Sequence, residues 1–150
     1  MSTDNLTFLE RTTIQMQYVV PLIRDLQRIL GEEVVNAALA QRIKDQTTEA
    51  KKSDVKAEDL SVMETSLETY AEGEALEFDI IRSEKDHFDM NVTGCGYAKM
   101  MDKLGASDIG FNLICALDIP MAEEMGMTLK RTQTCMQGAG HCDFRYTRRD

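Results

Sequence analysis

Apolar side chains recur at helical spacing through the first half of the chain. The first set predicts a helix over about residues 6–30, in which Pro21 produces either a kink or the junction of two helices. Its members are Leu9, Met16, Val20, Ile23 and Leu30. A second set follows Gly31 and predicts a shorter helix, and its members are Val34, Val35, Ala38, Leu39 and Ile43. Residues 44–59 are polar, and they either extend this helix or form a connection.

The spacing of apolar residues changes from helical to alternating at Leu76. Before it, a third helical set ends near Gly73, a residue typical of the position just beyond a helix. Its members are Leu60, Met63, Leu67 and Tyr70. After it, every second residue is apolar in two runs, which contain Leu76, Phe78 and Ile80, and then Phe88, Met90 and Val92. Residues 83–86 between the runs are polar, so a hairpin is expected.

Cys95 precedes a short helix that is expected over residues 96–104. Unpaired backbone N–H groups at a helix N-terminus favour an anion, so a thiol placed there ionises more easily. The flanking residues Gly94 and Gly96 let a ligand or another backbone segment come close. A buried and inert cysteine is the alternative interpretation.

A further helix is expected from Ser107, a suitable cap, to about residue 117, and Pro120 should end or bend it. Cys115 and Asp118 are three residues apart and would share one face of this helix. An aspartate near a helix C-terminus is disfavoured by the helix dipole. This position therefore indicates a partner or a role for Asp118, with an exposed turn residue as the alternative.

The stretch from residue 128 to residue 146 predicts two strands around a Gly138-Ala139-Gly140 turn. Before the turn, one face would carry Leu129, Arg131, Gln133 and Cys135. After the turn, alternation puts Cys142, Phe144 and Tyr146 on one face and His141, Asp143 and Arg145 on the other. A half-buried polar row is costly unless it is paired or used by a ligand, so we expect the functional site here.

These elements predict an α+β fold. Three N-terminal helices would pack on a small antiparallel sheet of about four strands, in the order ααα-ββ-αα-ββ. We expect a single domain over residues 1–150, with a helical part over 1–73 and a sheet-containing part with the site over 74–150.

Composition narrows the classes of function. The net charge of −9 argues against nucleic-acid binding, because a phosphate backbone requires clustered Lys and Arg. No apolar run approaches the roughly 20 residues that span a bilayer, and the N-terminus lacks the pattern of a signal peptide. We therefore expect a cytoplasmic protein whose four cysteines are reduced. No Cys-x-x-Cys pair occurs, which argues against a structural zinc site.

Several motifs of the C-terminal half resemble the L-2-amino-thiazoline-4-carboxylic acid hydrolase family. They are Asn91-Val-Thr-x-Cys95-x-Tyr97-Ala98, Cys115-x-x-Asp118, Arg131-Thr-Gln-Thr134 and Gly138-Ala-x-His-Cys-Asp-Phe-Arg-Tyr146. The resemblance covers about residues 76–146, and the N-terminal helices are similar only in general character. It implies a hydrolase that opens a small cyclic amidine, such as 2-amino-thiazoline-4-carboxylate, to a carbamoyl-cysteine product.

Ring opening requires a nucleophile, a proton donor and a cation for the substrate carboxylate. Thiols and an imidazole or carboxylic acid can supply the first two, so the expected catalytic residues are Cys95, Cys142, Asp118 and His141. A guanidinium suits a carboxylate, so the expected substrate-binding residues are Arg131 and Arg145, with Asp143, Cys115 and Tyr97. Neither a cofactor nor a metal is required.

Three other functions use the same residues or the N-terminal helices. Two or more thiolates with His141 can hold zinc that activates water. A small-molecule-binding or sensor domain without catalysis is the main alternative, because the layout also resembles the vinyl reductase type of ligand-binding domain. The long N-terminal helices and the ten methionines suit an oligomerisation module, and a homodimer through these helices is the expected protein partner.

Overall fold

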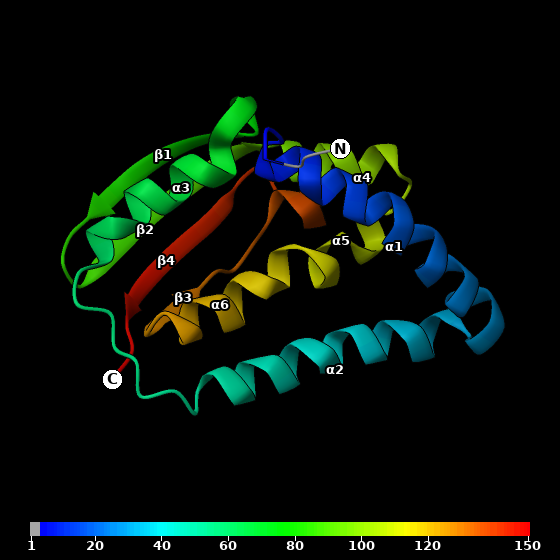
Figure 1. Cartoon of the computed structure of the whole chain (residues 1–150), viewed down its shortest axis with the longest axis horizontal. Coiled ribbons are helices and arrows are strands. Elements are labelled where there is room, and N and C mark those ends of the chain that lie inside the picture. Colours follow the sequence, from blue (N-terminus) through cyan, green and yellow to red (C-terminus); the bar gives the residue numbers. More distant parts are fainter. Residues whose placement is uncertain (1–3) are drawn as a thin grey trace.

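The structure, a computed structural model, describes residues 4–150. Within this part of the chain, six α-helices and four strands alternate in the order ααα-ββ-ααα-ββ, with short 3₁₀ helices between them (Figure 1). The helices are α1 Phe8–Leu30, α2 Glu32–Ala50, α3 Met63–Ala71, α4 Gly96–Lys103, α5 Ser107–Leu113 and α6 Asp118–Glu124. The strands are β1 Leu76–Ser83, β2 His87–Cys95, β3 Met127–Lys130 and β4 Cys142–Arg148. The 3₁₀ helices are η1 Leu60–Val62, η2 Glu72–Glu74, η3 Cys115–Leu117 and η4 Cys135–Gln137. The predicted α+β class is confirmed.

The first helix closely follows its prediction, whereas the second is longer than its apolar spacing alone requires. Thr7 and Glu10 form a reciprocal capping box at the start of α1, and α1 then continues through Pro21 to Leu30 as one helix. α2 extends to Ala50, so the first part of the polar stretch is helical and residues 51–59 form the connection. Across residues 4–150, no helix combines the length and the apolar character that crossing a membrane requires.

The four strands form one antiparallel sheet in the order β1-β2-β4-β3. The predicted alternation is clearest in β2, where Phe88, Met90 and Val92 are buried. β1 lies at one edge, and two irregularities in its pairing with β2 leave Ile80 and Ile81 largely exposed. The sheet therefore has one apolar face, to which the middle strands contribute most.

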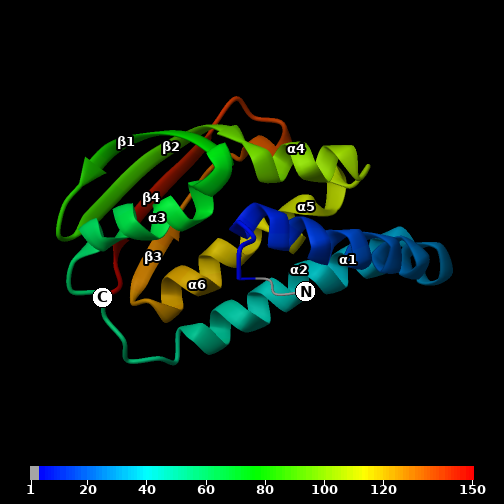
Figure 2. The same ribbon diagram turned by 45° about the horizontal axis from the view of Figure 1, so that its top comes forward.

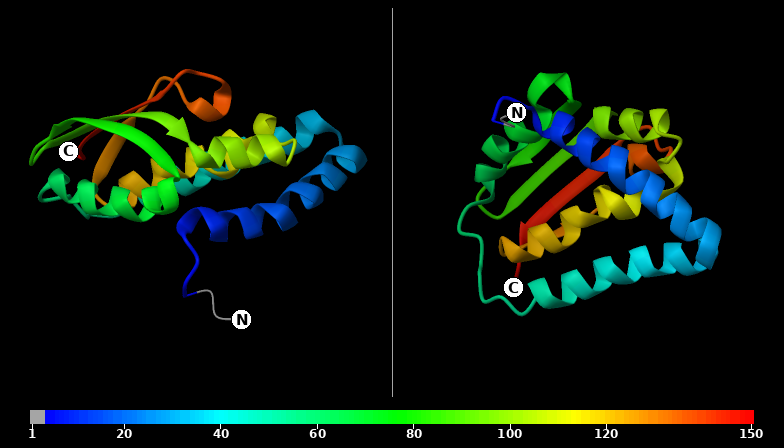
Figure 3. Two further views of the ribbon diagram at one scale, coloured as in Figure 1. Left: turned by 90° about the horizontal axis from the view of Figure 1, so that it is seen from above. Right: turned by 45° about the vertical axis from the view of Figure 1, so that its right-hand side comes forward.

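Helices cover one face of this sheet (Figures 2 and 3). Leu67 of α3 and Ala122 of α6 belong to the same buried cluster as the apolar residues of β2, β3 and β4. A second buried cluster joins α1, α2, α4 and α5, and includes Val20, Val35 and Ile109. α1 and α2 thus pack mainly on other helices, while α3 and α6 pack on the sheet.

The region between β2 and β3 differs from its prediction. The expected helix over residues 107–117 breaks at Ile114, whose φ of −124° and ψ of −68° are not helical. Pro120 lies in the first turn of α6 instead of ending a helix, because a first-turn residue needs no N–H partner within the helix. Asp118 is consequently the first residue of α6, where the dipole favours a carboxylate, and the expected C-terminal position was wrong.

The C-terminal hairpin is also less regular than predicted. β3 ends at Lys130, so Arg131, Gln133 and Cys135 do not share a strand face with Leu129. The chain instead forms a loop over residues 131–141, which contains η4 and a left-handed Gly138 with φ of +92°. The predicted alternation does hold after the turn, since Cys142 and Tyr146 of β4 are buried.

Gly126 makes the tight turn between α6 and β3. Its φ is +79°, and a Cβ atom at this position would lie 2.4–2.6 Å from the backbone of Lys56 and Ala57. The Gly126 carbonyl accepts hydrogen bonds from the N–H groups of Ala57 and Arg149. Only glycine allows this approach of three chain segments.

Candidate functional site

The candidate site is centred on the side chain of Arg131, which directly follows β3. This side chain is only 4% exposed. Its guanidinium donates to Asp118 Oδ2 at 2.8 Å and to the carbonyl oxygen of Cys115 at 2.8 Å. It also lies 4.8 Å from the ring centroid of Phe144 and 5.9 Å from that of Phe111. Hydrogen bonds and cation–π contacts therefore hold the cation in one position.

Asp118 is the acidic partner of this cation. Burial raises the pKa of its carboxyl group above the ordinary value, although the adjacent charge and hydrogen bond of Arg131 act in the opposite direction. Its side chain is nevertheless 36% exposed, so water or a small ligand reaches the carboxylate. A carboxyl group whose pKa is raised by burial beside a fixed cation is a candidate for proton transfer.

Arg131 also lines a cavity of about 240 Å³. Three apolar side chains and several hydroxyl or amide side chains form the rest of its wall: Phe111, Ile119, Leu129, Thr132, Gln133, Thr134 and Gln137. These residues come from α5, α6, β3 and the loop over 131–141, which lie next to one another in Figure 3 (right). A few polar groups on an otherwise apolar wall are typical of a site for a small molecule.

Asp143 holds the loop that carries Arg131. Its carboxylate accepts hydrogen bonds from the N–H and hydroxyl groups of Thr132 and from the N–H group of Gln133. Although burial acts in the opposite direction, these hydrogen bonds lower the pKa of Asp143 to about 2. In this structure Asp143 orders the loop at the cavity.

Two of the other expected site residues are held by contacts with neighbouring residues, Arg145 within the sheet and His141 at the loop over 131–141. The Arg145 guanidinium donates to the carbonyls of Met90 and Phe144 and to the Asn91 side chain, which ties β4 to β2. The His141 ring contacts the Gln133 side-chain amide at 3.0–3.1 Å. Their roles in binding and in proton transfer stay predictions.

Cys95 lies at the N-terminus of α4, as expected. Its Sγ accepts from the N–H group of Ala98 at 3.5 Å. Burial raises the pKa of the Cys95 thiol, and hydrogen bonds from the α4 backbone oppose this effect only in part. The helix N-terminus therefore favours the thiolate, but burial outweighs it.

Cys142 is more deeply buried, with 5% exposure. Its Sγ accepts from the N–H group of Cys135 at 3.1 Å, yet burial raises the pKa of this thiol to about 12. Burial also raises the pKa of Cys115, next to Asp118. At neutral pH these thiols are protonated.

Three of the expected residues, Cys95, Cys115 and Tyr97, lie within the electrostatic influence of Asp118. Burial is the main cause of their raised pKa values, the charge of Asp118 adds to it, and Arg131 counteracts the effect at Cys115. The Tyr97 hydroxyl donates to the carbonyl of Tyr70, which fixes the ring against α3. Thiols, acid and guanidinium from distant segments thus influence one another around one carboxylate.

The thiols do not form a metal site with His141 in the described part of the chain. The one group of three His, Cys, Asp or Glu residues whose ligand atoms lie within 4.8 Å of one another is Glu84, Asp86 and His87. These residues lie at the β1–β2 turn, and Glu84 and Asp86 are exposed.

Sequence reasoning missed several residues of the cavity. Thr132, Gln133 and Thr134 belong to the Arg131-Thr-Gln-Thr134 motif of the family resemblance, but Arg131 is the residue of this motif that is expected to bind substrate. Phe111 and Phe144 contact the guanidinium from α5 and β4. No local pattern signals these contacts, because they join segments distant in sequence.

Comparison with known proteins agrees with this description of the chain. The family model of L-2-amino-thiazoline-4-carboxylic acid hydrolase matches residues 11–146, and therefore extends through the N-terminal helices as well. No curated protein matches the sequence significantly.

Among solved structures, the phenol-responsive sensory domain of the transcription activator PoxR with phenol is similar, with 11% identity and a TM-score of 0.44. The match covers 87% of this chain and 73% of that chain. Because the family model matches residues 11–146, which is most of the chain and includes Cys95, Asp118 and Arg131, the chain belongs to the L-2-amino-thiazoline-4-carboxylic acid hydrolase family.

Proposed function

We propose that this protein hydrolyses a small cyclic amidine that carries a carboxylate, such as 2-amino-thiazoline-4-carboxylate, to a carbamoyl-cysteine product. The observation that carries the proposal is the Arg131–Asp118 pair, whose cation lines a cavity of about 240 Å³. Membership of the family gives independent support.

The charges of this pair complement such a substrate. The ring carries a carboxylate at one end and a basic amidine at the other. Arg131 offers a guanidinium to the carboxylate, and Asp118 offers a carboxylate to the protonated amidine. The Phe111 side chain and the hydroxyl and amide groups of Thr132 and Gln133 line the cavity beside Arg131.

The reaction adds one water molecule in total. The Asp118 carboxylate takes the proton of the Cys95 thiol, and the resulting thiolate adds to the carbon between the ring sulfur and the ring nitrogen. The C–N bond of the ring then breaks, and the nitrogen takes a proton from the carboxylic acid of Asp118. Water attacks the same carbon, releases the Cys95 thiol and leaves the carbamoyl group on the product. We assign the nucleophile to Cys95 in preference to Cys142 because it is less buried and caps α4.

The test is the incubation of the purified chain with 2-amino-thiazoline-4-carboxylate, with detection of carbamoyl-cysteine by mass spectrometry. Asp118→Asn and Cys95→Ala should each reduce turnover by at least about 100-fold, the usual size of a proton-transfer contribution. The Arg24–Asp108 pair is a matched control, since it is also an Arg–Asp pair but lies on the α1–α5 surface. Asp108→Asn should keep full turnover.

Binding without catalysis, as in a vinyl reductase-like sensor domain, is the second candidate. The raised pKa values of Cys95, Cys115 and Cys142 favour it, because protonated thiols are poor nucleophiles. Calorimetric titration separates the two functions. Saturable binding of the thiazoline that requires Arg131, without product, would replace the hydrolase proposal with the sensor proposal.

We also propose the homodimer expected from the N-terminal helices. The surface of α1, rather than the candidate site, supports it.

A further inference from the structure

α1 is apolar on two opposite faces. One face is buried against the rest of the protein and carries Met16, Val20 and Ile23, each at most 8% exposed. The other face carries large apolar side chains that are 36–76% exposed: Ile14, Tyr18, Leu22, Leu26 and Ile29. A helix that is apolar on all sides is usually buried on all sides, so the second face of α1 lacks a partner within the chain.

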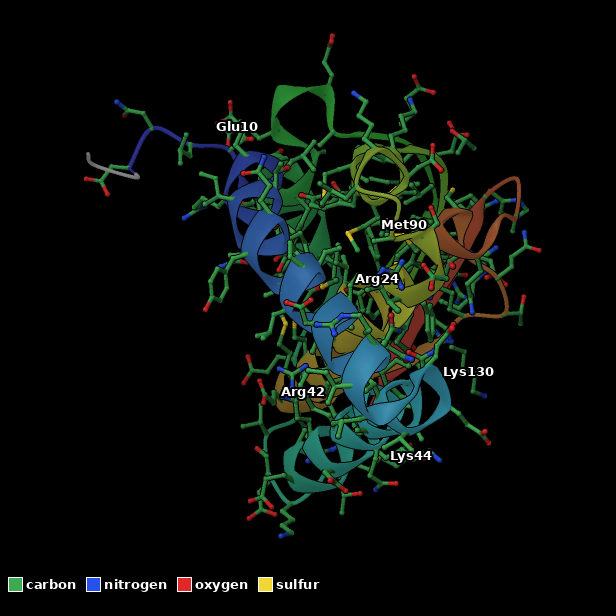
Figure 4. The ribbon with its side chains drawn as sticks, turned by 90° about the vertical axis from the view of Figure 1, so that its right-hand side faces the viewer. Glu10, Arg24, Arg42, Lys44, Met90 and Lys130 are labelled. Carbon is green, nitrogen blue, oxygen red and sulfur yellow. The ribbon has the colours of Figure 1, made fainter. Side chains whose placement is uncertain are left out.

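The exposed residues form a continuous stripe, called the α1 stripe below. Four of them follow one another at intervals of four residues, which makes them neighbours in one ridge that winds slowly around the helix. Leu30 and Val34, 57% and 60% exposed, extend the stripe around the α1–α2 corner. Figure 3 (left) shows α1 at the outer border of the molecule, and Figure 4 shows it crossing the front from Glu10 past Arg24.

The stripe is large enough for a stable interface. Its seven side chains are about half-exposed, which corresponds to roughly 60 Å² of apolar surface each and about 400 Å² per copy. Apolar atoms make up about 65% of homodimer interfaces. If the apolar surface of two such stripes is that share of the contact, the whole interface buries about 1,200 Å². This area lies at the lower end of stable protein–protein interfaces.

We propose that the α1 stripe of a second copy of this chain covers it, with the two helices antiparallel about a two-fold axis at Leu22. In this arrangement Leu22 packs on the partner's Leu22, and Tyr18 packs on the partner's Leu26. Each half of the stripe therefore meets the other half, which is the self-complementarity that a two-fold interface requires.

Charges at the ends of α1 favour the antiparallel orientation. Arg11 is exposed beside the start of the stripe, and Glu32 and Glu33 are exposed just beyond its end. Antiparallel helices bring Arg11 near the partner's Glu32 and the partner's Glu33. Parallel helices would instead place like charges together at both ends, which is unfavourable.

Analytical ultracentrifugation of the full chain tests the proposal. The wild type should sediment with twice the monomer mass of 16.9 kDa. Leu22→Glu places a charge at the centre of the interface and should raise the dissociation constant by at least about 100-fold. Leu22→Ala should weaken the dimer less, and circular dichroism checks that both variants are folded. Val62→Glu is the matched control, because Val62 is likewise an exposed apolar residue, at 55%, but lies in η1. This variant should remain dimeric.

Cross-linking tests the orientation. With Leu22→Cys, mild oxidation should join two copies through residue 22, whereas Ile14→Cys should give no such product above the wild-type background. Cross-linking of both variants would overturn the antiparallel arrangement. The proposed second copy would be overturned by a monomeric wild type, or by a dimer that Leu22→Glu leaves intact. A monomer whose α1 stripe instead binds a helix of another protein would overturn it as well.

Discussion

Asp118 and Arg131 are thirteen residues apart in sequence and are joined by a hydrogen-bonded ion pair of 2.8 Å. Asp118 begins α6, and Arg131 follows β3, so the pair closes the α6–β3 unit at the end opposite Gly126. The same guanidinium lines the cavity. A contact that stabilises the fold therefore also holds the cation of the candidate site at the cavity wall.

Arg131→Ala should destabilise the protein by about 2 kcal/mol, because it leaves a partly buried carboxylate without its cation. This value lies below the usual range for buried pairs, since solvent reaches Asp118. Arg131→Lys should recover part of the loss, because it keeps the charge but not the planar fork of donors. Urea unfolding measures both. Arg24→Ala, which removes an exposed pair, should cost less than about 1 kcal/mol, and an equal loss in both alanine variants would contradict the special position of Arg131.

Asp118→Asn should alter how stability depends on pH. Because the pKa of Asp118 is raised in the folded protein, its charged form opposes folding at all pH values above the folded pKa. This cost disappears as the pH falls through that pKa and the group becomes protonated. The wild type should therefore gain stability relative to Asp118→Asn on acidification from neutral pH. If the free energies of unfolding of the wild type and of Asp118→Asn differ by the same amount at neutral and at acidic pH, the pKa of Asp118 is not raised.

Asp143→Asn should show the opposite dependence. The pKa of Asp143 is about 2 in the folded protein, so its ionised form stabilises folding above the ordinary pKa, and this contribution is lost as the pH falls toward 2. At neutral pH we expect a loss of about 1 to 2 kcal/mol, after discounting for solvent screening of a partly exposed group. The difference between the variant and the wild type should shrink below about pH 4. Thermal unfolding of both proteins between neutral pH and low pH measures this difference in stability. A difference that does not change with pH would exclude the Asp143 carboxylate as its cause.

Alkylation should distinguish Cys95 from Cys142 in the folded protein. Cys142 is 5% exposed and has a pKa of about 12, so very little thiolate is present near neutral pH. Cys95 is only partly buried and receives an N–H group of α4. Iodoacetamide followed by peptide mass spectrometry should therefore show Cys95 modified well before Cys142. The unfolded protein is the control, in which the two cysteines should be alkylated at equal rates. Equal alkylation rates of Cys95 and Cys142 in the folded protein as well would contradict the difference between their environments.

Gly126→Ala should destabilise the protein by about 2 kcal/mol or more. The added Cβ would contact the backbone of Lys56, and the positive φ is unfavourable for alanine. Gly138→Ala is a useful control, since Gly138 also has a positive φ but faces open space. It should cost only the conformational part, about 1 kcal/mol. Urea unfolding compares the two, and equal losses would exclude the backbone contact as a cause.

The sequence by itself determined most elements of the first hundred residues and the direction in which many of their side chains point. Alternation in β2 and helical spacing in α1 and α3 reflect how each segment divides between the core and water, which is a local property. For the same reason, the position of Cys95 at the start of α4 and the buried side of Cys142 could be predicted. The family motifs located Arg131 and Asp118.

Only the tertiary structure decided how these groups are used. Asp118 begins a helix instead of ending one because the chain breaks at Ile114, and β3 is short where the loop is bound by Asp143. Burial, a collective property of many segments, raises the thiol pKa values that a helix N-terminus alone would lower. The uncovered second face of α1 likewise becomes visible only when the whole fold shows which apolar residues it leaves exposed.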